Sequence, residues 1–329
     1  MSGFGIGSVG LDGRAFLAPM SGVTDVVMRR IARRLGASAV VSEMVACDQF
    51  VKQDAETCLR AEGQGVSPHI VQLAGRDPHW MREAALLAEA SGAAVVDINM
   101  GCPAKRVIGG YAGSALMRDL DLAARLIEAA VKAVSIPVTV KMRLGWDDAS
   151  INAPELARRA ERLGAALITV HARTRNQFYK GTARWREVRP VVEATNLPVV
   201  INGDIGSAAQ ARHAFAESGA AAVMIGRAAL GRPWLVGDIA RELDGLPPRP
   251  ISRRQAGEIA VEHYEGLLTH FGLAVGIRHA RKHVAAYFAE LGETAAQAIA
   301  AKAVRSDDPA EVIALLRQAF NETAERLAA

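Results

Sequence analysis

Short apolar runs recur along the chain up to residue 227, and a segment with a helical pattern follows each of them. The runs span residues 15–20, 39–44, 70–75, 95–100, 138–143, 167–172, 199–204 and 222–227. Most are nearly continuous rather than alternating, which is typical of parallel strands buried on both faces. Eight strand–helix units in a stretch of this length predict an α/β fold, a (β/α)8 TIM barrel. An open doubly wound sheet is the competing architecture, but no G-x-G-x-x-G follows the first run.

Helix-start signals separate these runs and continue beyond them. Asp77 precedes Pro78, and Ser207 stands three residues before a glutamine, so both positions predict N-caps. The pattern changes at 245–251, a proline-rich stretch that predicts a linker. Ser252 then repeats the capping spacing, and no further β-rich run follows.

A second helix start in this last part is Asp308-Pro309. The apolar residues after it fall on one helical face, and they are Val312, Leu315, Leu316, Ala319 and Phe320. We therefore predict a barrel domain over 1–244, a linker over 245–251 and a small all-helical domain over 252–329.

Composition excludes several classes of protein. Half of the 329 residues are hydrophobic and 22% are charged, which argues against disorder. No apolar run approaches the roughly 18–20 residues of a membrane helix, and the first residues lack the pattern of a signal peptide. The three cysteines, Cys47, Cys58 and Cys102, form no C-x-x-C pair, so we expect no disulfides and a cytoplasmic location. The net charge of +4 is only a weak indication of an anionic partner.

Polar side chains lie where the predicted strands end, which is where barrel enzymes place their active sites. Strand interiors rarely tolerate lysine, histidine or asparagine without a need for them. A single such residue usually has a structural role, but the whole set at one end of the strands favours a functional site. The residues at these ends are Pro19, Met20, Ser21, Glu43, Met44, Gln72, Asn99, Lys141, Arg143, His171, Arg173, Asn202, Gly203, Asp204, Gly226 and Arg227.

The ends of the last two strands also predict a phosphate site. Asn202-Gly203-Asp204 and Gly226-Arg227 place glycines where a backbone can approach a ligand closely. An arginine at a helix start suits an anion.

Cys102 follows a glycine at a strand end and opens a glycine-rich loop over 101–119, which we expect to be mobile. An ordinary thiol is mostly protonated at neutral pH, so it can donate a proton. Cys47 and Cys58 lack such a context and are predicted to be structural. No metal site is expected, because Ala280 stands where an H-E-x-x-H motif between His279 and His283 would need glutamate. A G-x-S-x-G nucleophile elbow is also absent.

At these positions the sequence resembles the tRNA-dihydrouridine synthases, most closely the bacterial B subfamily. The resemblance rests on LAPMSGVTD (17–25), DINMGCPAKRV (97–107), VKMRLGW (140–146), VHARTRNQFYKG (170–181), INGDI (201–205), MIGRAALGRPW (224–234) and GIRHARKHVAAYF (276–288). It implies an enzyme in which FMN, reduced by NADPH, passes a hydride to C6 of a tRNA uridine, while a cysteine protonates C5. The product would be 5,6-dihydrouridine.

The resemblance also implies roles for individual residues. Cys102 would be the catalytic proton donor, and Asn99 and His171 would contact uracil or flavin. The other flavin contacts would come from Pro19, Met20 and Ser21 through their backbone, from Gln72 and Lys141 at the polar edge of the ring, and from Asn202, Gly203, Asp204, Gly226 and Arg227 at the ribityl phosphate.

A basic surface would bind the RNA phosphates. Its predicted members are Lys105, Arg106, Arg173, Arg175, Lys180, Arg278, Arg281 and Lys282. Phe178 and Tyr179 either stack on a nucleotide or pack their own loop. We expect the D-loop as the target, at position 17, and a monomeric protein.

Three alternatives stay open. A flavin barrel similar to dihydroorotate dehydrogenase would act on a free pyrimidine, but it would need no basic helical domain. An RNA-binding protein on an inactive barrel would not need Cys102 and Lys141. The same chemistry could also act on ribosomal RNA.

Overall fold

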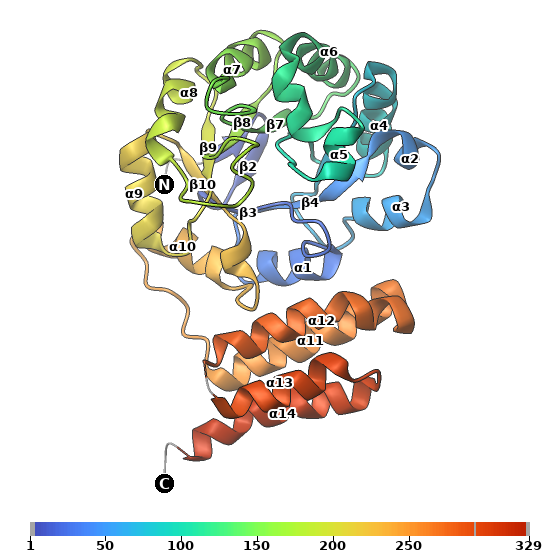
Figure 1. The fold of residues 1–329 in the computed structure, drawn as a ribbon, viewed down its shortest axis with the longest axis vertical. Coiled ribbons are helices and arrows are strands. Elements are labelled where there is room, and N and C mark those ends of the chain that lie inside the picture. Colours follow the sequence, from blue (N-terminus) through green and yellow to red (C-terminus); the bar gives the residue numbers. More distant parts are fainter. Residues whose placement is uncertain (1–3, 293, 327–329) are drawn as a thin grey trace.

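A closed barrel of eight parallel strands forms the larger part of the molecule (Figure 1). The computed structural model describes residues 4–292 and 294–326. The barrel strands are β3 (Ala15–Leu17), β4 (Ala39–Ala46), β5 (Ile70–Ala74), β6 (Val95–Met100), β7 (Val138–Arg143), β8 (Leu167–His171), β9 (Val199–Asn202) and β10 (Ala222–Ile225). They pair in chain order, and β10 closes the ring on β3. The prediction of a TIM barrel is confirmed.

The strand ends differ from the predicted runs near the carboxyl end of the barrel. β3 ends at Leu17 and β9 at Asn202, because the residues after them leave the ladder and form loops. β4 instead continues to Ala46 after a register shift against β5. The residues released from β3, β9 and β10 line the cavity described below.

Helices surround the barrel on its outside. They are α1 (Val26–Arg34), α2 (Cys47–Val51), α3 (Ala55–Ala61), α4 (Pro78–Ala90), α5 (Lys105–Gly109), α6 (Leu120–Val131), α7 (Ala153–Arg162), α8 (Arg189–Glu193), α9 (Ala208–Ser218) and α10 (Leu235–Leu243). Short 3₁₀ helices cover Gly113–Arg118, Trp185–Val188 and Arg227–Ala229. The predicted N-caps are confirmed: Asp77 accepts from the backbone of His79, and Ser207 from that of Gln210.

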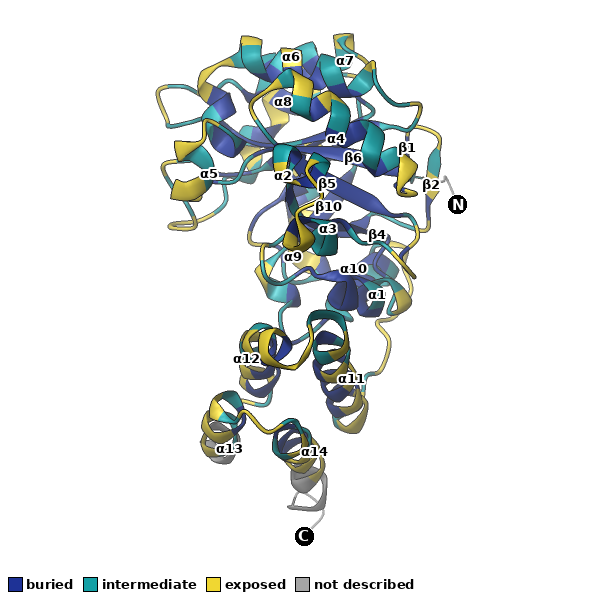
Figure 2. Cartoon of the chain, turned by 90° about the vertical axis from the view of Figure 1, so that its right-hand side faces the viewer, coloured by how far each residue is buried: buried dark blue, intermediate teal, exposed yellow. Residues whose placement is uncertain are grey.

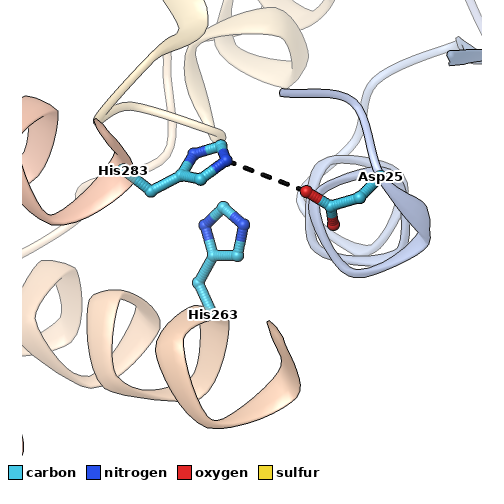
Figure 3. A group of neighbouring side chains, drawn as sticks. All are labelled: Asp25, His263 and His283. Carbon is cyan, nitrogen blue, oxygen red and sulfur yellow. Dashed lines mark ion pairs between the residues drawn. The ribbon is translucent and has the colours of Figure 1, made fainter. Parts of the chain in front are cut away.

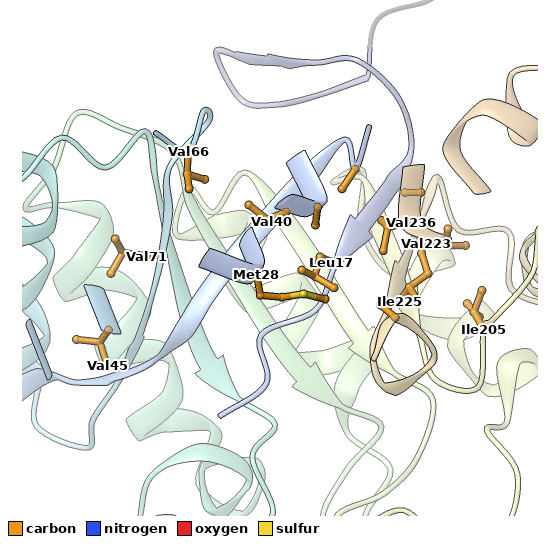
Figure 4. Close-up of a cluster of buried hydrophobic side chains, with 14 of the residues drawn as sticks. Leu17, Met28, Val40, Val45, Val66, Val71, Ile205, Val223, Ile225 and Val236 are labelled. Atoms are coloured by element: carbon orange, nitrogen blue, oxygen red, sulfur yellow. The ribbon is translucent and has the colours of Figure 1, made fainter. Parts of the chain in front are cut away.

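The barrel has two hydrophobic layers, because successive strand residues point to opposite faces. Leu17, Val40 and Val223 point outward into the core shared with the helices (Figure 4). Phe16 and Val41 belong to a separate cluster inside the barrel. The interior is thus packed with side chains at one end, which leaves the other end for a site.

A hairpin missed by the sequence patterns covers the end of the barrel where the strands begin. β1 (Phe4–Ile6) and β2 (Val9–Leu11) pair antiparallel, and Ile6 and Leu11 pack into the interior cluster. Their three-residue runs are too short to give a periodic signal. Residues 1–3, part of the segment judged not to be a signal peptide, lie outside the described residues.

In the part of the chain that the structure describes, four helices follow the barrel, with no helix or strand between Asp244 and Ser252. They are α11 (Arg253–Phe271), α12 (Leu273–Glu290), α13 (Thr294–Arg305) and α14 (Pro309–Arg326). Ser252 and Gln255 form the predicted capping box. The apolar face predicted after Pro309 is buried. Residues 293 and 327–329 of the predicted helical domain lie outside the described residues.

The first two of these helices lie against the barrel (Figure 2). α11 contacts α1, Val27 packs at Gly266, and Arg34 pairs with Glu262 at 2.5 Å. α13 and α14 lie farther from the barrel than α11 and α12. Among the described residues, no helix combines the length and apolarity needed to cross a membrane.

Candidate functional site

A cavity of about 750 Å³ opens at the carboxyl end of the barrel strands. It gathers most of the predicted site residues from different strands. Those lining it are Pro19, Met20, Ser21, Gln72, Asn99, Cys102, Lys141, His171, Arg173, Asn202, Gly203, Asp204, Gly226 and Arg227. Seven predicted RNA contacts do not line it, namely Lys105, Arg106, Arg175, Lys180, Arg278, Arg281 and Lys282.

A chain of buried hydrogen bonds crosses the floor of this cavity. The Thr139 hydroxyl donates to Asp97 Oδ1 at 2.6 Å, and Gln72 Nε2 donates to Asp97 Oδ2 at 2.7 Å. Asn99 Nδ2 donates to Gln72 Oε1 at 2.7 Å. Each amide is therefore held in one orientation by its neighbour.

The far end of this chain holds the backbone of Cys102. Asn99 Oδ1 accepts from the N–H groups of Gly101 and Cys102, at 3.2 and 3.0 Å. The Cys102 carbonyl accepts from both the N–H and the hydroxyl of Ser114. The thiol thus stands on a backbone fixed on both sides. The loop after it contains α5 and a 3₁₀ helix rather than extended chain.

Lys141 reaches the same space from β7. Its ammonium donates to Asn202 Oδ1 at 3.2 Å. Burial, with Arg143 nearby, lowers the pKa of Lys141 to about 8, although Asp97 opposes the shift. Burial raises the pKa of Asp97 to about 6, and bonds from Gln72 and Thr139 oppose that shift. A lysine with this pKa is mostly charged at neutral pH and can release a proton slightly above it.

His171 ends β8 beside three arginines. Burial and the cations around it, foremost Arg143, hold the pKa of His171 well below its usual range. The imidazole is therefore neutral at neutral pH, and it offers one N–H donor and one acceptor rather than a charge.

Arg143 connects two loops of the site. Its Nε donates to the Gly101 carbonyl at 2.8 Å, and its Nη1 donates to the carbonyls of Thr174 and Phe178, both at 2.9 Å. Its guanidinium carbon lies 5.5 Å from the Tyr179 ring centroid. One buried side chain thus positions both the Cys102 loop and the loop after β8.

The prediction that Arg173 belongs to an outer RNA-binding surface is wrong. Arg173 is only 1% exposed, and its guanidinium forms two bonds with Asp204, at 3.0 and 2.6 Å. Its other N–H groups donate to the Lys180 and Gly181 carbonyls. Because β9 brings Asp204 beside β8, the cation is neutralised within the protein and fixes the loop after β8.

This pair also changes the interpretation of Asp204. Its carboxylate is engaged by Arg173 and by the Ala183 N–H at 2.8 Å. Burial alone would raise the pKa of Asp204, but these bonds together hold it below the usual value. A carboxylate would repel a phosphate, so only the backbone of this segment suits one. Gly203 adopts φ +124° there, and a Cβ at this position would lie 3.0 Å from His171 and Ala183.

Arg227 remains available at the end of β10. Its side chain is 60% exposed, and the nearest Asp204 oxygen is 3.8 Å away. It also lies over Tyr179, 5.1 Å from the ring centroid.

The other predicted basic residues divide between two elements outside the cavity. Lys105 and Arg106 are exposed on α5, and Arg278 and Lys282 are exposed on α12. Lys282 comes close to the cavity, since its Nζ lies 2.6 Å from where a Cβ of Gly22 would stand. Arg281 is partly used, in an ion pair with Asp307 at 2.8 Å.

The two aromatic residues of the loop after β8 have different surroundings. Arg175 lies over both Phe178 and Trp146, each at 4.6 Å, so Phe178 packs within its own loop. Tyr179 is 52% exposed and lines the cavity. Lys180, the next residue, is exposed.

Three positioning residues were not assigned a role from the sequence: Glu43, Asp97 and Arg143. The Glu43 carboxylate accepts from the Gly22 N–H, beside Ser21 of the cavity. Asp97 and Asn99 occupy alternate positions of one strand, a signal that both point into the barrel. For Glu43 and Arg143, no spacing in the sequence identifies the partner.

The fold and the cavity define a (β/α)8-barrel enzyme with its site at the carboxyl ends of the strands. A family model described as dihydrouridine synthase matches residues 16–325. The chain belongs to the dihydrouridine synthase family, and the protein is an oxidoreductase.

Curated relatives match this chain over nearly its full length. A probable tRNA-dihydrouridine synthase of Rhizobium leguminosarum bv. phaseoli is 53% identical, over 94% of this chain and 95% of the relative. A probable tRNA-dihydrouridine synthase of Rhodobacter capsulatus is 48% identical, over 96% of this chain and 97% of the relative. A tRNA-dihydrouridine synthase B of Xanthomonas campestris pv. campestris is 41% identical, over 96% and 95%.

Solved structures share the fold at low identity. Morphinone reductase in complex with tetrahydroNAD matches with a TM-score of 0.52 and 16% identity, over 76% of this chain and 92% of that chain. A 2-naphthoyl-CoA reductase matches with a TM-score of 0.58 and 12% identity, over 75% and 52%. These similarities show the barrel alone.

Proposed function

We propose that the protein reduces a uridine of tRNA to 5,6-dihydrouridine, with FMN as its flavin and NADPH as reductant. The observation that carries this proposal is the position of Cys102, whose fixed backbone places a thiol in the same cavity as Lys141 and Arg227. The curated relatives are named for action on tRNA, and several solved neighbours are reductases.

The residues present fit a flavin mononucleotide. The cavity volume of about 750 Å³ lies in the range of small-ligand sites. Gly203 lacks a Cβ where one would crowd His171, and Gly226 with Arg227 ends the neighbouring strand. These two strand ends would hold the phosphate, with Arg227 as the cation and backbone N–H groups as further donors. Gln72 and Lys141 would face the polar edge of the ring.

Each remaining group of the cavity then has a defined task. FMN held there would supply the hydride chemistry needed at C6 of the uracil. The Cys102 thiol donates the proton that C5 receives, and its backbone bonds to Asn99 and Ser114 keep the sulfur in place. Lys141 provides positive charge beside the ring, which favours the reduced flavin. Neutral His171 and Asn99 offer hydrogen bonds to the polar edge of the base or of the flavin.

The substrate must reach this cavity from a folded RNA. A stacked base cannot enter it, so the uridine must be flipped out. Lys105, Arg106, Arg278 and Lys282 are exposed at two elements outside the cavity and would contact phosphates. We propose the D-loop, position 17, as the target. We further propose a monomer that acts in the cytoplasm.

Mass spectrometry of digested tRNA tests this function. Purified protein is incubated with NADPH and tRNA that lacks dihydrouridine, and one D-loop uridine should gain two mass units. Ribosomal RNA and free uracil are assayed in parallel. A gain on either of these, with none on tRNA, would contradict the proposed substrate.

Two cysteine variants test the proton donor. Cys102→Ala should keep its FMN but lose at least about a hundredfold in turnover, the usual contribution of a positioned acid. Cys58→Ala is the matched control, since Cys58 is a partly buried cysteine of α3 that does not line the cavity. Equal turnover in the two variants would exclude Cys102 as the acid.

A further inference from the structure

Three buried side chains meet where the helical domain touches the barrel. Asp25 is the N-cap of α1, His263 belongs to α11 and His283 to α12. Their exposed fractions are 2%, 1% and 3%. Figure 3 shows that the carboxylate and both imidazoles point toward one another, and one donor atom from each lies within 4.8 Å of the others.

The facing atoms have no hydrogen-bond partner. They are Asp25 Oδ2, His263 Nε2 and His283 Nε2. The separation of 3.8 Å between Asp25 Oδ2 and His283 Nε2 is too long for a hydrogen bond. Buried polar atoms are normally paired, so three unpaired ones that face a common point indicate a shared partner between them.

The opposite atoms of two of these side chains are held in place. Asp25 Oδ1 accepts from the Met28 N–H at 3.0 Å as the helix cap. His263 Nδ1 lies 3.1 Å from the Tyr287 hydroxyl. When that nitrogen carries the proton, the Nε2 lone pair of His263 faces the cluster. A metal-binding histidine is commonly oriented in this way by a partner on its other nitrogen.

We propose that Asp25, His263 and His283 bind a divalent transition metal of the zinc class at the junction of the two domains. Two imidazole nitrogens and one carboxylate oxygen suit zinc, with a fourth position left for water. Atoms bound to zinc at about 2.0–2.1 Å in a tetrahedron stand roughly 3.4 Å apart. The 3.8 Å between Asp25 and His283 is a few tenths of an ångström longer than this, and all three ligand atoms lie within 4.8 Å of one another, so metal binding would draw the side chains together.

Such a metal would fix the helical domain to a loop of the active site. Asp25 directly follows the segment 18–24, which includes Met20 and Ser21 of the cavity. His283 directly follows Lys282, whose ammonium lies beside Gly22. The metal would thus set the position of the basic side chains of α12 relative to the cavity. The sequence did not predict it, because its ligands come from positions far apart in the chain.

Metal analysis of the untagged full chain tests the proposal. Protein produced in zinc-supplemented medium should retain about one zinc per chain after dialysis. Its melting temperature should fall when a strong chelator is present during refolding, because a metal that binds only the folded state stabilises it. Neither measurement depends on the flavin, RNA or activity, so this inference stands or fails separately from the proposed function.

Isosteric variants identify the ligands. Asp25→Asn keeps the cap acceptor and the volume, and His283→Gln removes one imidazole; each should lower zinc affinity at least tenfold. His213→Gln is the control, because His213 lies on α9 with its side chain 65% exposed. X-ray absorption at the zinc edge should show nitrogen and oxygen ligands at about 2.0–2.1 Å.

Two results would overturn the proposal. One is a zinc content near zero in the supplemented wild type. The other is zinc retained to the same extent by both variants. Either would mean that a proton or a water molecule, rather than a metal, joins the three side chains.

Discussion

The pair formed by Arg173 and Asp204 allows a quantitative test of how the site is held together. The guanidinium is almost fully buried, and four of its hydrogen bonds go to Asp204 and to the Lys180 and Gly181 carbonyls. Asp204 adopts φ +54°, a conformation that asparagine also tolerates. Asp204→Asn therefore removes the charge and one acceptor without adding backbone strain.

The expected loss follows from this geometry. An asparagine amide would direct its NH₂ at one guanidinium nitrogen, so one charged bond is lost and the cation stays uncompensated. Removing one partner of a fully buried pair costs about 3–5 kcal/mol, and a single charged hydrogen bond about 1.5–3 kcal/mol. Because the Asp204 side chain is 33% exposed, water replaces part of the loss. We expect Asp204→Asn to lower the free energy of unfolding by about 2–3 kcal/mol.

Tryptophan fluorescence during urea unfolding measures this loss in the barrel. All four tryptophans lie before residue 245, so the signal does not come from the helices α11–α14. The corresponding fall in melting temperature is roughly 4–12 °C for a domain of this size. Asp148→Asn is the matched control: Asp148 pairs with Arg184 but its side chain is 72% exposed, and its loss should be about 1 kcal/mol or less.

A double-mutant cycle decides whether the pair itself is responsible. Arg173→Met should cost much less in the Asp204→Asn background than in the wild type, with a coupling energy of about 2 kcal/mol. A coupling energy below about 0.5 kcal/mol would refute the reasoning, because the two side chains would then act independently.

Three further predictions concern the cavity and the basic surface. Because the pKa of Lys141 is lowered, the folded flavin-free protein binds fewer protons than the unfolded chain between about pH 8 and 10.5. Its free energy of unfolding, compared with that of Lys141→Met, should therefore rise across this window by up to about 3 kcal/mol. A difference that stays constant in urea unfolding across this range would show that burial does not shift the pKa. Asn99→Leu should lower kcat at least about tenfold in the flavin-loaded enzyme, since the Cys102 N–H loses its acceptor. Rapid-mixing kinetics with tRNA would show this, and an unchanged kcat would exclude the positioning role. Replacing Arg278 and Lys282 together by alanine should weaken tRNA binding and reduce the slope of log K against log salt by roughly two, with wild-type FMN content; an unchanged slope in filter binding would place the RNA surface elsewhere.

Local sequence patterns were sufficient to predict the strands, the helix starts and the reactive side chains at the strand ends. A continuous apolar run marks a buried parallel strand, and an Asp-Pro or Ser-x-x-Gln spacing marks a helix start, within ten residues or fewer. Asn99 and Lys141 were found because a polar side chain inside such a run conflicts with its burial. Cys102 was found because it stands two residues after the end of one of these runs.

Pairing between distant residues was not accessible in the same way. The sequence predicts Arg173 as one more surface arginine. Only the pairing of β8 with β9 in the structure shows that Asp204 neutralises its charge. The sequence places Arg143 at the end of a strand, but it does not show that its hydrogen-bond partners lie on two different loops. The β1–β2 hairpin is too short for periodicity, and its position depends on the interior cluster that it covers.

The sequence by itself determined the eight strands, the helical end of the chain, and the residues available at the mouth of the barrel. Only the tertiary structure decided which charges meet there, and that Asp25 faces two histidines from helices more than two hundred residues away. The physical reason is the distance along the chain over which each interaction acts. Backbone preference and amphipathic period act between neighbours along the chain, whereas electrostatic pairing and burial depend on distances that exist only after the barrel has closed and the helices have docked.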